Sequence, residues 1–268
     1  MAGVLFVNPR SGSDEPTPAQ LEAAARARGL DVHVLRPDDD LEELARSADA
    51  EALGMAGGDG SLGAVAAVAI ERDLPFVVVP YGTRNHFARD LGLDRDDPIA
   101  ALDGFTGRER RVDVGRADDR LFLNNVSLGL YARLVHRRER HRRRREALAR
   151  LRAFGILLRH PRALRASVDG EPIGARILLV ANNAYTLRLL ELGEREQLDG
   201  GQLHLYASSG PFRGGGWEEH CAERFTVDVD RHRLRAAVDG EPALLETPTE
   251  FRIEPLALRV LVPAEAEA

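Results

Sequence analysis

The chain has 268 residues and a formal net charge of −6 at pH 7, and all 37 of its Lys-plus-Arg residues are arginine. The absence of lysine excludes a Walker A phosphate loop and excludes Schiff-base or pyridoxal phosphate chemistry, each of which needs a lysine side chain. With 44% hydrophobic and 30% charged residues, the composition is that of a globular protein with one large or two small domains. The single cysteine, Cys221, excludes an intramolecular disulfide.

The N-terminal segment, Met1 to Val7, carries no charged side chain and is followed at once by Asn8-Pro9-Arg10. We therefore expect no secretory signal peptide. No apolar run approaches the roughly 18 residues that a membrane-spanning helix needs. A lone cysteine also fits a reducing compartment, so the sequence predicts a soluble, cytoplasmic protein.

The first hundred residues alternate predicted strands with predicted helices. The apolar runs that predict strands are Gly3–Val7, Asp31–Leu35, Ala52–Ala56 and Phe76–Val79. The segments with helical patterns are Pro18–Arg28, Leu41–Ser47, Leu62–Glu71, His86–Leu91 and Ile99–Phe105. Apolar strands that alternate with helices indicate a parallel sheet covered on both faces.

After about residue 108 the pattern changes to short strands separated by turn residues. The predicted strands are Arg111–Val114, Leu121–Val126, Leu164–Val168, Arg176–Ala181, Gln202–Tyr206, Phe225–Val229, Leu234–Val238, Glu250–Ile253 and Leu258–Val262. We therefore predict an α/β + β protein, with an α/β domain over 1–108 and an antiparallel β-sandwich domain over 109–268. A helical insert interrupts the second domain at about 134–158. The prediction allows the C-terminal residues of the second domain to pack against the first domain.

A glycine-rich loop, Gly58-Asp59-Gly60-Ser61-Leu62-Gly63, lies between the third predicted strand and a helix. Glycines let the backbone approach a phosphate, and a helix N-terminus supplies N–H donors. A dinucleotide site would add an acidic residue about 20 residues further on. The segment Val77–Gly82 contains none. The loop therefore predicts phosphate binding that is not of the Rossmann type, and a tight turn without a ligand is the plain alternative.

Two further polar loops follow predicted strands, namely Asn8–Gly12 after the first and Pro80–Asn85 after the fourth. The carboxyl ends of parallel strands meet at one edge of a sheet, where open α/β sheets bind their ligands. Three such loops in register predict one ligand site at that edge.

These segments resemble the signatures of the diacylglycerol kinase catalytic domain family, which includes sphingosine and ceramide kinases and is related in fold to NAD kinases. The residues that carry the resemblance are Asn8-Pro-Arg-Ser-Gly12, Gly57-Gly-Asp-Gly-Ser61, Gly82-Thr-Arg-Asn-His-Phe-Ala-Arg-Asp-Leu-Gly92, Val112-Asp-Val-Gly115, Phe122-Leu-Asn-Asn125, Ser127-Leu-Gly-Leu-Tyr131 and Val238-Asp-Gly-Glu241. The resemblance implies an N-terminal nucleotide-binding domain, a β-sandwich domain, and a site that handles ATP phosphates without a Walker lysine.

The resemblance also implies roles for individual residues. The residues expected to bind ATP are Asn8, Arg10, Ser11, Gly57, Gly58, Asp59, Gly60, Ser61, Thr83 and Asn85. Asp239 and Glu241 are expected to carry the acid–base or metal-organising role, with Asp59 as a second candidate for the base. Because Asp-Gly-Glu-Pro occurs twice, at 169–172 and at 239–242, the residues alone do not rank the two copies.

The chain departs from the family pattern at several positions. Ser61 replaces a threonine and keeps the hydroxyl, while His86 stands where aspartate is common, and we expect a structural histidine there. Asp199 is the candidate metal ligand, although Gly200 occupies the position where an aspartate is usual. The segment 182–185 replaces a glycine-rich turn, so lipid specificity can differ from that of better-known members.

Arginine is concentrated between Arg133 and Arg165. This stretch contains 13 arginines and only two acidic residues, both glutamates. A basic amphipathic helix at 134–158 would suit an anionic membrane surface. A core-packed helix with a solvated arginine face is the alternative. Nucleic-acid binding is disfavoured because no aromatic residues interleave with the arginines.

The combined interpretation is an ATP- and Mg²⁺-dependent kinase that phosphorylates a diacylglycerol-like or other amphiphilic lipid alcohol, as in phospholipid metabolism. Lipid hydroxyl attack on a γ-phosphate needs a proton acceptor, and the transferred group needs cations. The alternatives are an NAD kinase-like enzyme and an inactive lipid- or nucleotide-binding module. We expect a cytoplasmic protein that is peripheral at the inner membrane face, and the oligomeric state, a homodimer included, is left open.

Overall fold

The computed structural model describes residues 2–12, 15–129, 164–188, 191–192, 194–208, 217–264 and 266. The chain forms two compact units. The first unit comprises Met1–Val114, Tyr185–Gly201 and Glu254–Ala268, and the second comprises Gly115–Ala184 and Gln202–Ile253. The predicted insert at about 134–158 lies outside the described residues.

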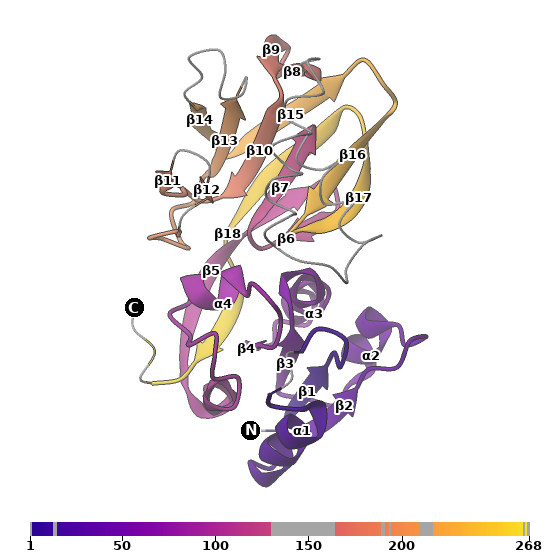
Figure 1. Ribbon diagram of the computed structural model, residues 1–268, viewed down its shortest axis with the longest axis vertical. Helices are drawn as coiled ribbons and strands as arrows, with labels where there is room; N and C mark the ends of the chain where they lie inside the picture. The colour runs from indigo at the N-terminus through magenta and orange to yellow at the C-terminus, as the bar shows by residue number, and fades with distance from the viewer. Residues whose placement is uncertain are drawn as a thin grey trace. The chain divides into compact units, whose positions relative to one another are not determined.

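The first unit contains a parallel sheet in the order β2-β1-β3-β4-β18 (Figure 1). Its strands are β1 (Gly3–Val7), β2 (Asp31–Val34), β3 (Ala52–Gly57), β4 (Phe76–Pro80) and the C-terminal part of β18 (Thr249–Val262). Every residue of β1, β3 and β4 is buried, as expected for strands covered on both faces. This confirms the predicted parallel α/β sheet.

Four α-helices accompany the sheet among the described residues of this unit, α1 (Pro18–Ala27), α2 (Leu41–Ser47), α3 (Asp59–Glu71) and α4 (His86–Asp90). Local sequence explains where they begin. Thr17 and Gln20 form a capping box before α1, and the Asp40 carboxylate accepts two backbone N–H groups at the start of α2. The segment predicted as a helix at 99–105 is instead a 3₁₀ helix, η1 (Ala100–Thr106). Gly104 and Gly107 pack there against the backbone of Leu261 and Val262, which favours the tighter turn.

The second unit contains an all-antiparallel six-stranded sheet in the order β14-β13-β10-β7-β16-β17. Its strands are β7 (Asn125–Gly129), β10 (Ile177–Asn182), β13 (Leu203–Ser208), β14 (Glu218–Ala222), β16 (Arg233–Val238) and β17 (Glu241–Glu246). Further strands belong to the other sheet, β6 (Arg120–Phe122), β8 (Leu164–Val168), β9 (Glu171–Ala175) and β15 (Arg224–Val229), with parts of β5 (Arg108–Ala117) and β18. A two-stranded ribbon, β11 (Leu187–Arg188) with β12 (Glu191–Leu192), stands apart from both sheets.

A hydrophobic core lies between the two layers of the second unit. Val126, Leu178 and Val180 from the six-stranded sheet share this core with Phe225 and Phe251 from β15 and β18. The predicted antiparallel β layer is therefore confirmed.

Five strands of the structure were not predicted. Three of them, β9, β14 and β17, each lie at the edge of a sheet, and the other two, β11 and β12, form the separate ribbon. Edge strands face water, so they lack the apolar run from which the other strands are predicted. Two predicted strands at 250–253 and 258–262 are in fact one continuous strand, β18, with Leu256 at a positive φ of 52°. The predicted strand 121–126 is divided into β6 and β7.

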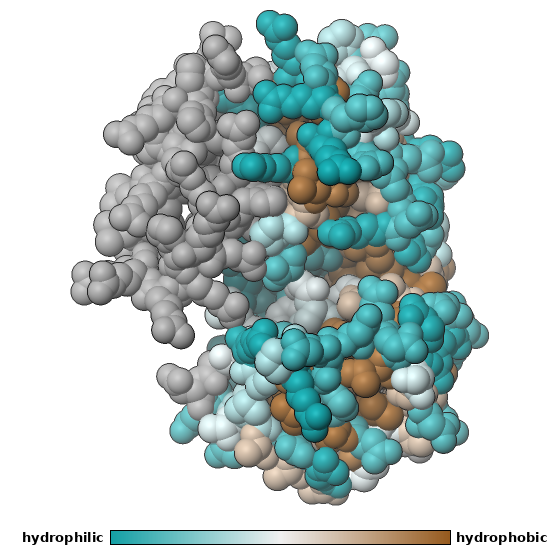
Figure 2. Space-filling view, turned by 90° about the vertical axis from the view of Figure 1, so that its right-hand side faces the viewer, coloured by the Kyte–Doolittle hydropathy of each residue, from teal (hydrophilic) through white to brown (hydrophobic). Residues whose placement is uncertain are grey.

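The described residues on the face drawn in Figure 2 are mostly hydrophilic. On the face drawn in Figure 2, teal side chains predominate and hydrophobic areas lie between them. Among the described residues, the large hydrophobic side chains that are exposed are Leu244 and Leu256. No helix within the described ranges is both long enough and apolar enough to span a bilayer.

Candidate nucleotide-binding site and candidate carboxylates

Three loops of the first unit meet at the carboxyl ends of β1, β3 and β4. The parallel register pairs Val7 with Ala56 and Gly57 with Pro80, so the strands end at the same level. The Asn8 backbone N–H donates to the Ala56 carbonyl over 2.9 Å, and the Tyr81 N–H donates to the Gly57 carbonyl over 3.2 Å. The structure thus brings together the three loops that the sequence placed at one edge of the sheet.

The loop after β3 and the loop after β4 are in backbone contact. A Cβ atom added to Gly82 would lie 2.5 Å from the Gly58 Cα atom and 3.0 Å from the Gly58 nitrogen. Gly57 likewise has no room for a side chain, because its Cβ would collide with the Ser61 hydroxyl group. Gly82 is needed for the close approach of the two loops, and Gly57 for the tight packing within its own loop. Both leave backbone rather than side chains at the sheet edge.

Short-range contacts hold the first loop in shape. The Asn8 Oδ1 atom accepts the Arg10 N–H over 3.0 Å. The Tyr81 hydroxyl group donates to the Pro16 carbonyl over 2.7 Å, and its ring lies against Gly12. Burial raises the pKa of Tyr81 above its usual value of 10.0, so the hydroxyl stays a donor at neutral pH. Tyr81 therefore fixes the loop that carries Arg10, which is itself exposed.

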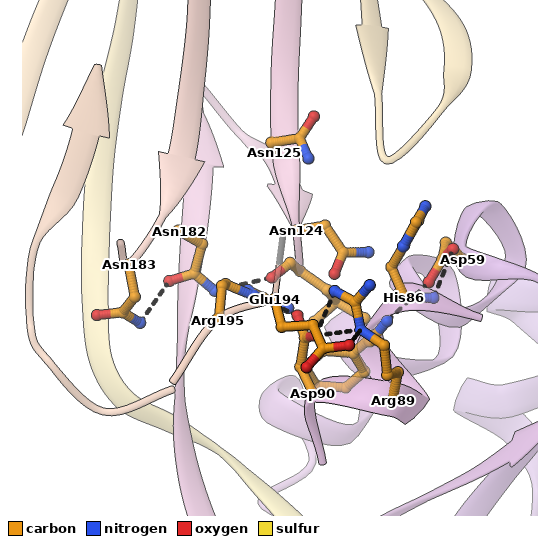
Figure 3. Close-up of polar contacts among 12 residues, drawn as sticks. Asp59, His86, Arg89, Asp90, Asn124, Asn125, Asn182, Asn183, Glu194 and Arg195 are labelled. Carbon is orange, nitrogen blue, oxygen red and sulfur yellow. Dashed lines mark hydrogen bonds and ion pairs between the residues drawn. The ribbon is translucent and has the colours of Figure 1, made fainter. Parts of the chain in front are cut away.

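Asp59 connects α3 to α4. The side chain is 9% exposed, and its two oxygens accept the backbone N–H groups of His86 over 3.2 Å and Phe87 over 3.1 Å (Figure 3). Ser61 caps the same turn by donating to the Gly58 carbonyl over 2.9 Å, so the serine hydroxyl has a local role. The candidate base Asp59 is thus an acceptor for the backbone of the neighbouring loop.

Asn85 is buried in a left-handed conformation with φ of 46°. Its Nδ2 group donates to the Gly82 carbonyl over 2.9 Å, whereas its buried Oδ1 atom has no hydrogen-bond partner. A buried acceptor without a donor is rare in folded proteins. Nucleotide hydroxyl and amino groups are donors and phosphate oxygens are not, so Asn85 fits the base or ribose better than the phosphates.

His86 lies half-buried beside Asp59 at the start of α4 (Figure 3). Burial lowers the pKa of His86 below its ordinary value of 6.5, and the Arg89 and Arg84 guanidinium groups also lower it. The Asp59 and Asp90 carboxylates act in the opposite direction. The imidazole is consequently neutral at physiological pH.

A charge cluster with a buried centre ties Arg195 to α4 within the first unit. The Arg195 Nε atom lies 2.7 Å from Asp90 Oδ2, and both side chains are fully buried. Arg89 contacts the other oxygen of Asp90 over 2.7 Å and lies 3.7 Å from Glu194 (Figure 3). The Arg195 guanidinium also faces the rings of Phe87 and Tyr185, with its central carbon 5.9 and 5.4 Å from their centroids. Neither Asp90 nor Arg195 was among the predicted site residues.

The turn that contains Asp199 is held by Asp113, which is also buried. The Asp113 N–H donates to the Leu198 carbonyl over 2.7 Å, and its carboxylate accepts the N–H groups of Gly201 and Leu256. Asp199 itself is exposed. Within the described ranges, no group of three or more His, Cys, Asp and Glu side chains is arranged to hold a metal ion. A metal role for Asp199 stays a prediction.

In the second unit, the two copies of Asp-Gly-Glu-Pro differ in what their aspartates contact. Both form two-residue hairpin turns with positive φ at Asp and Gly, as Asp-Gly turns favour. The Asp169 carboxylate accepts one backbone N–H, from Thr226. The Asp239 carboxylate accepts three, from Leu123 over 2.7 Å and from the next two residues over 2.8 and 3.0 Å.

Asp239 therefore fixes the segment between β6 and β7, which explains why one predicted strand is divided. This segment carries Asn124 and Asn125, and Asn182 of β10 reaches it by donating to the Leu123 carbonyl over 2.9 Å (Figure 3). Asn124 and Asn182 are buried, and neither was assigned a role from the sequence. Glu241, two residues after Asp239, is exposed at the start of β17.

Comparison with known proteins agrees with this arrangement. Residues 2–117, which hold all three loops, match the family model of the diacylglycerol kinase catalytic domain. This match supports the resemblance that the motifs of the three loops indicate. The chain is 25% identical over 260 residues to the "Probable lipid kinase YegS-like" of Klebsiella pneumoniae, covering 92% of this chain and 78% of the relative.

A second relative is the "Diacylglycerol kinase" of Mycobacterium tuberculosis, which is 34% identical over 125 residues. That match covers 42% of this chain and 40% of the relative. The crystal structure of a diacylglycerol kinase from Bacillus anthracis superposes with a TM-score of 0.71 at 15% identity, covering 99% of this chain and 98% of that chain. The similarity in fold to that structure thus extends over both units.

Proposed function

We propose that the protein transfers the γ-phosphate of ATP to the hydroxyl group of a diacylglycerol-like or other amphiphilic lipid alcohol. The observation that carries the proposal is the glycine contact between the loops after β3 and β4, inside the segment that matches the kinase family model. Relatives named as lipid kinase or diacylglycerol kinase support the same class of substrate.

We assign the nucleotide to the three loops of the first unit. The loop backbones at Gly57, Gly58 and Gly82 offer the close approach that phosphates need. Asn85 supplies a buried acceptor for a nucleotide donor group. Since the chain has no lysine, an arginine must neutralise the phosphates, and Arg10 is exposed on the first loop.

Mg²⁺ belongs to this proposal because phosphoryl transfer usually needs the ion to neutralise charge on the phosphates. Proteins commonly hold Mg²⁺ by one or two carboxylates together with substrate phosphates, so a large carboxylate cluster is not required. Both Asp239 oxygens accept backbone N–H groups, whereas Glu241 is exposed. We therefore assign the metal-organising role to Glu241, with Asp239 positioning its surroundings.

A phosphate-transfer assay tests the proposed function. Purified protein is incubated with radiolabelled ATP, Mg²⁺ and mixed micelles that contain diacylglycerol, ceramide, sphingosine or a monoacylglycerol. We expect label in at least one lipid, and loss of that label in the Glu241→Gln variant. Label in NAD and in none of the lipids would favour the NAD kinase-like alternative. ATP binding without transfer to any acceptor would favour the inactive module.

We also propose that the arginine-rich segment at 134–158, which lies outside the described residues, binds anionic membrane surfaces. The support is its charge, because each cation near an anionic surface contributes about 1 kcal/mol. The variant with Arg142–Arg145 replaced by serine should sediment less with vesicles containing phosphatidylglycerol. Equal sedimentation of both proteins would contradict this role.

A further inference from the structure

We propose that Arg195 is a positioning residue of the nucleotide site and acts through the Asp90 carboxylate, which fixes α4 and the loop that precedes it. The inference rests on the part of the proposed function that assigns ATP to the loop Gly82–Asn85. Arg195 lies outside residues 2–117, which match the family model, so that match assigns it no role.

Helix α4 is too short to hold its own position. It spans five residues, whereas an isolated helix of fewer than about 12 residues is unstable in water. Its N-terminal end is held by Asp59, whose carboxylate accepts the N–H groups of His86 and Phe87 over 3.2 and 3.1 Å. Asn85 is the N-cap of the same helix, so a shift of α4 moves the end of the nucleotide loop.

The C-terminal end of α4 is held by Arg195. The Asp90 carboxylate binds two guanidinium groups, that of Arg195 on Oδ2 over 2.7 Å and that of Arg89 on Oδ1 over 2.7 and 2.9 Å (Figure 3). Arg89 belongs to α4 itself, so its contact cannot fix the helix against the rest of the first unit. Arg195 is 105 residues away from Asp90 in the chain and therefore can.

Arg195 also contacts α4 at Phe87. The central carbon of its guanidinium group lies 5.9 Å from the centroid of this ring, which is fully buried. Phe87 and Asp90 are three residues apart, so they lie on the same side of the helix. Because the Phe87 N–H binds Asp59, the residues that contact Arg195 include one at each end of α4.

Burial makes the position of α4 sensitive to this contact. Neither Asp90 nor Arg195 is exposed to solvent, so water cannot replace a donor that moves away. A buried carboxylate that loses a cationic partner is costly, whereas an ion pair on the surface tolerates such a change. Displacement of α4 is therefore strongly opposed, and the loop at its N-terminal end keeps one position.

The first test measures the Kd for a non-hydrolysable ATP analogue with Mg²⁺ by calorimetry. Arg195→Gln should raise this Kd about tenfold or more, because a small misplacement of binding groups has effects of that order. In the micelle assay the KM for ATP should rise to a similar extent, while the KM for the lipid that the wild type phosphorylates stays unchanged. Circular dichroism establishes that the variant is folded.

Leu30→Ala is the matched control for a loss of stability alone. Leu30 is buried just before β2 begins, at the edge of the sheet opposite to the three loops. The substitution leaves a cavity there and destabilises the protein without touching α4. Its Kd for the analogue should equal that of the wild type, and an increase as large as in Arg195→Gln would overturn the inference.

A double variant tests whether Arg195 acts through Asp90. Arg195→Gln and Asp90→Asn each deprive a buried charged side chain of a partner, whereas both together leave two neutral amides. If the two residues act as one unit, the double variant should bind the analogue no more weakly than the weaker single variant. Losses of affinity that multiply would show separate roles and overturn the inference.

The wild type supplies a measurement that needs no substitution. If the analogue binds more tightly when the Arg195–Asp90 pair is formed, linkage requires the bound analogue to stabilise the pair by the same factor. Hydrogen exchange of the Arg195 Nε–H group, followed by nitrogen NMR, should therefore slow about tenfold when the analogue is bound. Unchanged exchange would overturn the inference, even if Arg195→Gln failed to fold.

The outcomes separate this inference from the kinase function. If the wild type binds the analogue but phosphorylates no acceptor, the kinase function fails and the binding measurements still decide the role of Arg195. If a folded Arg195→Gln variant binds the analogue as tightly as the wild type, Arg195 is not a positioning residue and the kinase function stands. If the wild type binds no ATP analogue, both fall together.

Discussion

Asp90 and Arg195 form an ion pair of 2.7 Å in which neither side chain is exposed to solvent. Their positions are 105 residues apart in the chain. A charge buried alone is costly, so each side chain needs the other, and the pair holds Arg195 against α4 within the first unit. The helix in turn begins with His86 and follows directly after Asn85, so the pair supports the loop that we assign to the nucleotide.

Replacing Arg195 with methionine should destabilise the protein by about 3 kcal/mol, since Asp90 would stay buried with only Arg89 as a partner. Urea unfolding followed by circular dichroism measures the change. Arg26→Gln is the matched control, because the ion pair of Arg26 with Glu22 is on the surface. We expect a much smaller change there. Equal effects of both substitutions would show that the buried pair has no special role.

Gly82→Ala should weaken ATP binding, because a Cβ atom would lie 2.5 Å from the Gly58 Cα atom and push the two loops apart. The cost in stability should be about 1–3 kcal/mol. Gly174→Ala is the control, since nothing lies within 4 Å of its added Cβ atom. Calorimetric titration with ATP compares the two variants. Tight binding by Gly82→Ala would contradict the placement of the nucleotide at these loops.

Asp239→Asn should destabilise the second unit by about 1–3 kcal/mol, because an amide group turns an N–H donor toward backbone N–H groups that need an acceptor. Asp169 lies in the same turn of the other Asp-Gly-Glu-Pro copy, and its carboxylate accepts a single backbone N–H. The Asp169→Asn variant should therefore lose less stability. Thermal unfolding of the two variants gives the comparison. A larger loss in Asp169→Asn would mean that the contacts of Asp239 do not determine its importance.

Stability should depend on pH through His86. Its pKa is lowered in the folded protein, so below the ordinary value of 6.5 the unfolded chain binds the proton more readily. The free energy of unfolding should therefore decrease as pH falls from 6.5 through the folded pKa. His86→Asn should flatten this decrease relative to the wild type and to His220→Asn, a control that changes an exposed histidine of β14. Urea unfolding at several pH values between 5 and 7 supplies the data, and identical slopes in all three proteins would refute the expectation.

The sequence alone determined the order of strands and helices in the first unit. It also determined that the three loops meet at one edge of the parallel sheet. Apolar runs such as Phe76–Val79 predict buried strands because every residue of them must avoid water, and glycines mark where two loops come close. It also indicated the resemblance to the diacylglycerol kinase catalytic domain, through motifs that lie in those loops. Edge strands such as β14 escaped prediction because one side of them faces solvent.

Only the tertiary structure decided which polar residues touch. Asp90 and Arg195 are too far apart in the chain for any periodicity to pair them. The two copies of Asp-Gly-Glu-Pro have the same local turn, and they differ only because the Asp239 carboxylate meets the segment 123–125. The contact of the Asp59 carboxylate with the start of α4 is equally invisible in the sequence. Local sequence governs propensity and burial over a few residues, whereas a carboxylate or imidazole takes its role from partners that chain folding brings to it.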